Sequence, residues 1–163
     1  MRDIIEDFFS KSAEERIAYA IMGLEALFLR GGESEELSRR LAQRVARILG
    51  IIGFNSIDVY NTMKRGYRIR SAYVHGSTIK KLDHNIVNMY AREILDYLRI
   101  CVILMIKLLI SNSTKKNITK QKDEIIELID DSLIDDESYK ILKEKIAVIK
   151  IPRVNELINE EKC

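Results

Sequence analysis

The segment SAEERIAYAIMGLEALFLRGG, residues 12–32, shows how this chain folds. Ser12 and Glu15 have the spacing of a capping box, in which each side chain bonds the other residue's backbone N–H at the start of a helix. Apolar side chains then recur at intervals of three and four residues: Ile17, Ala20, Ile21, Leu24, Leu27 and Phe28. The pattern predicts a helix that begins after Ser12 and ends at Gly31 and Gly32.

Two further helices are expected in the first half of the chain. Apolar side chains at helical spacing predict one over residues 34–49, which Gly50 terminates. A separate face of this helix is basic and consists of Arg40, Arg44 and Arg47. Ser56 is the expected N-cap of the next helix, which reaches the neighbourhood of Gly76, with Gly66 loosening it midway.

The second half of the chain predicts one long helix and two short ones. Asp83 can cap a helix that reaches Ile110 and is apolar nearly all round over its last turns, so we expect it at the centre of a bundle. Shorter helices are expected over residues 119–130 and 136–149. Residues 123–137 contain eight acids and no base, which is typical of a solvated face. Whether these helices pack on the bundle or contact a partner stays open.

The fold class that follows is all-α, an up-and-down bundle of about four core helices with two shorter C-terminal helices. A length of 163 residues fits one domain over 1–163, with a core at about 12–110 and a helical extension at about 119–163. Lys and Arg number 27 and Asp and Glu number 25, so the net charge of +2 gives no overall electrostatic reason to bind nucleic acid or a membrane. Any such reason must be local.

Cysteine usage and hydropathy indicate the compartment. Two cysteines, Cys101 and Cys163, cannot form a disulfide framework, which favours a reduced, cytoplasmic location. The N-terminal residues carry acids where a signal peptide needs a basic start. The most apolar run, residues 100–110, is interrupted by Lys107 and is shorter than the roughly 20 residues that cross a bilayer. We therefore expect no membrane partner.

The strongest local charge asymmetry lies between Asp58 and Asp83, where no acid occurs. Six bases stand there: Lys64, Arg65, Arg68, Arg70, Lys80 and Lys81. With Tyr67 and Tyr73 they offer cations for phosphates and rings on which bases can stack, as in single-strand RNA binding. An ordinary basic surface is the alternative.

Arg70 and His75 suit RNA cleavage without a metal. Imidazole can exchange a proton with a ribose hydroxyl near neutral pH, and guanidinium can hold the phosphate as charge develops on it. On an ideal helix, however, five residues separate two side chains by about 140°, so a helix end or a second subunit is needed. Gly76 can provide that helix end in a left-handed conformation. Two histidines without clustered cysteines or carboxylates predict no metal site.

Three segments together resemble the ApeA-like branch of the HEPN superfamily: Leu24-Glu25-Ala26-Leu27-Phe28, a Glu-rich turn followed by residues 37–50, and Arg70-Ser71-x-x-Val74-His75-Gly76. The resemblance covers about residues 15–110. It implies a helical bundle that dimerises, with an R-x4-6-H motif from each subunit in one composite ribonuclease cleft. Arg70 and His75 match that motif, and Ser71 stands where many members carry Asn, Asp or His, so it is a supporting residue with one hydrogen bond to offer.

The resemblance thus implies a metal-independent endoribonuclease that acts through 2′-hydroxyl attack in a defence, toxin or RNA-processing role. The residues expected to bind the RNA are Lys64, Arg68, Tyr73, Lys80 and Lys81. RNA and a second copy are the expected partners, no cofactor is expected, and an antitoxin or nucleotidyltransferase partner stays open. Ser77 stands where one subgroup has a modified tyrosine, so nucleotidylation by that route is not expected.

Two other readings remain open from the residues. One is a non-catalytic helical dimerisation module that binds RNA, a nucleotide or a partner protein. The other is a structural subunit in which Arg70 and His75 only stabilise an interface. For Glu25, in an apolar stretch of the first helix, a surface or intrahelical partner is favoured over pairing with a site arginine.

Overall fold

The computed structural model describes residues 11–76, 83–111 and 117–151. Within these ranges the chain is all-α and has no strand, as predicted. The helices are α2 (Ala13–Phe28), α3 (Leu37–Ile51), α4 (Ser56–Val74), α5 (His84–Ser111), α6 (Ile118–Asp131) and α7 (Asp136–Ala147). None of these helices has an apolar stretch that could cross a bilayer.

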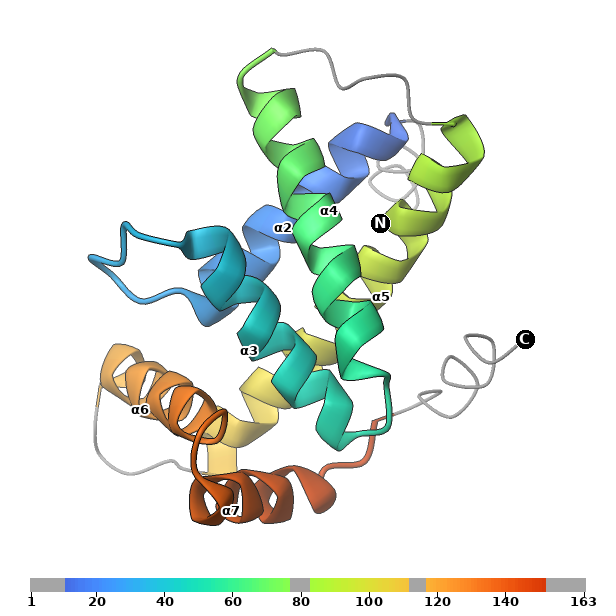
Figure 1. Ribbon diagram of the computed structural model, residues 1–163. Helices are drawn as coiled ribbons and strands as arrows, with labels where there is room; N and C mark the ends of the chain where they lie inside the picture. The colour runs from blue at the N-terminus through green and yellow to red at the C-terminus, as the bar shows by residue number, and fades with distance from the viewer. Residues whose placement is uncertain (1–10, 77–82, 112–116, 152–163) are drawn as a thin grey trace.

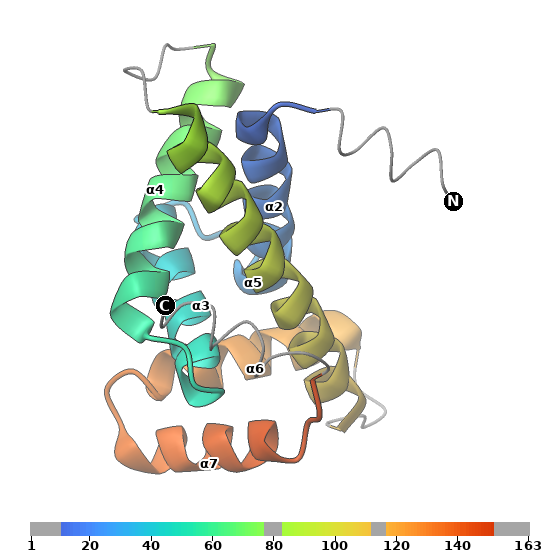
Figure 2. The same cartoon turned by 90° about the vertical axis from the view of Figure 1, so that its right-hand side faces the viewer.

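The first four of these helices form the bundle, and α6 and α7 lie across one end of it (Figure 1). In this view α4 runs upward while α3 and α5 run downward. α2 packs against both α4 and α5, and α3 packs against α4. Turned by 90°, α2, α4 and α5 stand upright above the nearly horizontal α7 (Figure 2). The end of α4 that carries the candidate motif therefore lies far from α6 and α7.

The helix starts follow side-chain capping, with one correction. The Ser12 hydroxyl accepts a hydrogen bond from the Glu15 backbone N–H at 3.1 Å, and the Asp83 carboxylate accepts one from the Asn85 N–H at 2.9 Å, as expected for these caps. The prediction that Ser56 caps α4 is wrong by one residue. Asn55 holds that position, and its side-chain oxygen accepts hydrogen bonds from the N–H groups of Ile57 and Asp58. Asparagine and serine are equally good N-caps, so residue type alone does not choose between these neighbours.

Gly66 does not loosen α4, because the helix is continuous from Ser56 to Val74. The glycine is buried where α4 meets α2 and α5. A Cβ atom at this position would overlap with the Ile94 side chain and lie 3.1 Å from Ile21 Cδ1. The missing side chain thus allows three helices to approach closely.

α5 runs through the core but is not enclosed all round. Its buried side chains continue to Leu108. Ile106 and Ile110, however, are 50% and 70% exposed, so over the last turns the expected central position holds for one side of the helix and not for the other. The neighbouring helices α6 and α7 cover only part of the apolar surface of this segment.

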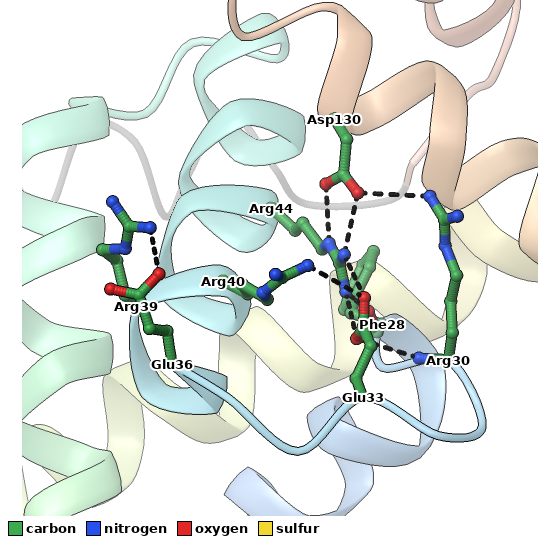
Figure 3. A network of polar contacts seen from close by, with 8 residues as sticks. All are labelled: Phe28, Arg30, Glu33, Glu36, Arg39, Arg40, Arg44 and Asp130. Carbon is green, nitrogen blue, oxygen red and sulfur yellow. Dashed lines mark hydrogen bonds and ion pairs between the residues drawn. The ribbon is translucent and has the colours of Figure 1, made fainter.

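Arg44 is the main correction to the predicted basic face of α3, because its side chain is only 1% exposed. All five of its N–H donors are used (Figure 3). Two go to Glu33 at 2.6 and 2.9 Å, two go to Asp130 at 2.7 and 2.8 Å, and one goes to the Phe28 carbonyl at 2.6 Å. Arg44 therefore ties the end of α2, the α2–α3 loop and α6 to α3.

The two C-terminal helices pack on the bundle, which answers a question left open by their periodicity. Ile125 and Ile129 of α6 and Leu142 and Ile146 of α7 belong to the same core cluster as the first four helices. Asp130, one of the eight acids expected on a solvated face, instead faces Arg44. The rest of the predicted extension, residues 152–163, lies outside the described residues.

Candidate functional site

The outward face of α4 carries four of the predicted site residues. At about 100° per residue, Lys64, Arg68, Ser71 and His75 project within about 60° of one another. The buried residues of α4 include Val59, Met63, Gly66 and Ile69, and these lie on the opposite side of the helix. The helical period thus gathers the predicted RNA-binding bases and the predicted catalytic histidine into one line, which we call the α4 basic face.

The cations of the α4 basic face are free to meet an anion. Lys64 is half-buried and Arg68 is exposed, and neither forms an ion pair or hydrogen bond within the described part of the chain. Both are therefore available to bind an anionic ligand. The other two predicted bases, Lys80 and Lys81, lie outside the described residues.

His75 stands at the exposed end of this face, directly after the last residue of α4. Its backbone N–H donates to the Ser71 carbonyl at 3.1 Å, and its φ and ψ are −90° and 3°. Gly76 follows with φ of +63°, which confirms the predicted left-handed terminator. His75 itself is in the bridge region between helical and extended backbone, and within the described residues no hydrogen bond or ion pair joins its side chain to Arg70.

Arg70 points away from the α4 basic face and towards α2. Its guanidinium donates to Glu25 at 3.1 Å, and the two side chains are 24% and 15% exposed. The expected surface or intrahelical partner for Glu25 is therefore wrong. The guanidinium carbon also lies 5.7 Å from the centre of the Tyr67 ring. Arg70 Nε is buried and has no hydrogen-bond partner among the described residues.

Tyr67 and Tyr73, the two tyrosines predicted to stack on bases, lie against different neighbours. Desolvation, followed by the nearby Glu25 carboxylate, raises the pKa of the Tyr67 hydroxyl above its usual value. Tyr73 lies about 180° round α4 from Lys64, and desolvation together with Glu15 raises the pKa of its hydroxyl. Tyr67 is thus close to the α4 basic face, whereas Tyr73 belongs to the side that meets α2.

An open groove of about 440 Å³ lies between the start of α3 and the middle of α4. From α4 it is lined by Lys64 and Tyr67, and from the α2–α3 loop and α3 by Ser34, Glu36, Ser38 and Arg39. Glu36 and Arg39 form an ion pair with each other. The lysine is therefore the cation of the groove that no acid of the described chain neutralises.

Sequence reasoning missed the groove residues on the α3 side, and a partial signal existed for them. Ser34 and Ser38 flank the Glu-rich turn, where short polar side chains are typical of helix starts. Nothing local in the sequence indicates that this turn faces Lys64, 30 residues further along. The packing of α3 against α4 brings the two segments together.

The chemistry that this site offers is that of an acid–base group and cations. Within residues 11–76, 83–111 and 117–151, no three His, Cys, Asp or Glu side chains gather where they could hold a metal ion. Lys64 and Arg68 can bind phosphates, and the exposed imidazole of His75 can give or accept a proton. Arg70 can contribute only where a phosphate approaches from the α2 side.

Comparison with known proteins adds no relative to this description: no protein-family model, no curated protein and no solved structure matches the chain.

Proposed function

We propose that this protein is a metal-independent endoribonuclease of the HEPN type. The observation that carries the proposal is the exposed His75 at the end of the α4 basic face, in line with Lys64 and Arg68. A strand whose phosphates lie along these cations brings its ribose groups to the imidazole. His75 then takes the proton from a 2′-hydroxyl or gives one to the departing 5′-oxygen, and the product end is a 2′,3′-cyclic phosphate.

Arg70 stabilises the negative charge that develops on the phosphate, and we propose that it does so in a site shared by two chains. On an ideal helix Arg70 and His75 diverge by about 140°, and within one chain Arg70 is paired with Glu25 of α2. A two-fold axis near the end of α4 would set Arg70 of one copy against the partner copy's histidine. The Arg70 side chain is 24% exposed, which leaves the outer part of the guanidinium able to donate to a phosphate oxygen.

One observation favours a second candidate, a non-catalytic helical module that binds RNA. The ion pair with Glu25 already occupies Arg70, as a purely structural role for this arginine would require. In that case Lys64 and Arg68 hold the RNA, and neither Arg70 nor His75 acts on it.

The test is cleavage of a labelled mixed-sequence RNA in excess EDTA by wild type and by the His75→Ala, Arg70→Ala and His84→Ala variants. His84, an exposed histidine at the start of α5, is the matched control. We expect cyclic-phosphate ends from wild type and His84→Ala, and no cleavage from the other two variants at unchanged helical circular dichroism. Cleavage by His75→Ala at the wild-type rate would remove His75 from the mechanism.

Mixing the two inactive variants tests the shared site. If each site takes Arg70 from one chain and His75 from the other, an equal mixture regains roughly a quarter of wild-type activity, because half the dimers are mixed and each has one intact site. No recovery would refute the composite site. RNA that is bound at low salt but never cut by wild type would favour the binding module.

A further inference from the structure

We infer that the groove between the start of α3 and the middle of α4 is a second RNA subsite, which holds a backbone phosphate several nucleotides away from the one at His75. This inference takes its ligand from the proposed function. It adds a fixed path for the strand, along the α4 basic face from the groove to the end of the helix.

Charge in the groove favours a phosphate. Glu36 and Arg39 neutralise one another in an ion pair, and Lys64 has no acidic partner in the described chain. The net charge of the lining is therefore positive by one ammonium group. Ser34 and Ser38 add hydroxyl groups, which can donate to the remaining phosphate oxygens.

The lining of the groove suits a nucleotide rather than a bare ion. The groove is open to solvent, so a strand can pass across it. The Tyr67 ring lines the groove and is supported by the Arg70 guanidinium, 5.7 Å from its centre. An aromatic ring held in this way beside a cation is the arrangement on which nucleic-acid bases stack.

The helix axis sets the distance between the two subsites. At about 1.5 Å per residue, Lys64 and His75 are about 17 Å apart along α4, with Arg68 between them on the same face. Stacked nucleotides advance by about 3.4 Å each, so the strand between the subsites would contain about five of them, and fewer if it is extended. A dinucleotide is therefore too short to reach both.

The experiment measures binding, so that it does not depend on turnover. Fluorescence anisotropy follows a labelled 2′-O-methyl uridine decamer, which lacks the attacking hydroxyl, over a series of salt concentrations. Wild type is compared with Lys64→Gln and with Lys143→Gln, a matched control at an exposed position of α7, at the other end of the molecule. Cleavage of an RNA decamer and an RNA dinucleotide is measured in parallel.

We expect Lys64→Gln to weaken binding about tenfold, as for the loss of one charge-assisted hydrogen bond. It should also lower the slope of log affinity against log salt by about 0.7, the contribution of one phosphate contact on a single strand. Lys143→Gln should change neither. Cleavage of the decamer should slow in Lys64→Gln and not in Lys143→Gln, and wild type should cut the dinucleotide more slowly than the decamer.

The two proposals fail in different ways. A Lys64→Gln variant with wild-type affinity and salt slope would overturn the subsite, even if wild type cuts RNA at His75. A wild type that does not bind the decamer would overturn it as well. Wild type that binds with the expected dependence on Lys64 but never cuts RNA would support the subsite and refute the proposed ribonuclease.

Discussion

Protonation of Glu33 should weaken the fold in acid, because this carboxylate is an essential part of the Arg44 cluster. Its side chain is 13% exposed and accepts two hydrogen bonds from Arg44. These bonds lower the pKa of Glu33 from 4.5 to about 2, although desolvation acts in the opposite direction. The unfolded chain, in which the contact is absent, titrates near the ordinary value.

The size of the effect follows from the difference between these two pKa values. At about 1.4 kcal/mol for each pH unit, the change from 4.5 to about 2 corresponds to about 3 kcal/mol of folding free energy. A lowered pKa means that the unfolded state binds the proton more tightly. The stabilisation is thus fully present above about pH 5 and is lost as the pH falls towards 2, with less than half remaining at about pH 3.

Urea denaturation followed by helical circular dichroism measures this effect in wild type and in Glu33→Gln. At about pH 7 the variant should be less stable by about 2–3 kcal/mol, and near pH 2 the two proteins should converge. Glu35→Gln is the matched control, since Glu35 is exposed and has no partner in the described chain. An equal pH dependence in wild type and Glu33→Gln would refute the reasoning.

Three further predictions concern the packing and capping of the helices. Gly66→Ala should destabilise the protein by about 1–3 kcal/mol in the same assay, because the added methyl group displaces Ile94; an unchanged stability would mean that this contact relaxes freely. Asn55→Ala should lower the free energy of unfolding by about 1 kcal/mol, and Ser56→Ala should lower it by less than about half of that. The reverse order would indicate that Ser56, and not Asn55, caps α4. Burial raises the pKa of the Cys101 thiol, so this thiol should be unreactive in the folded protein. In a Cys163→Ser variant, which removes the other thiol, Cys101 should react with Ellman's reagent only as fast as the protein unfolds. Rapid labelling of the native protein would contradict the burial of Cys101.

The helices could be predicted from the sequence because their determinants are local. The apolar period of α2 and its Ser12 cap lie within a few residues of one another, and both are confirmed. The role of Arg44 could have been suspected from the same pattern, since it is three residues after Leu41 and four before Ile48, within the apolar stripe. The partners of Arg44 could not be predicted, because Glu33 and Asp130 are 11 and 86 residues away in the chain.

For the candidate site as well, the features set by local sequence could be predicted and those set by long-range packing could not. Which residues share a face of α4 follows from the helical period alone, so the divergence of Arg70 and His75 could be predicted. What each face meets depends on how α2 and α3 pack, and this is where Glu25 and the groove enter. Arg70 turns inward to Glu25 of α2, while His75 stands at the exposed end of the α4 basic face. If the protein cleaves RNA as we propose, cleavage therefore requires either a second copy whose Arg70 reaches the phosphate or a substrate that displaces Glu25 from Arg70.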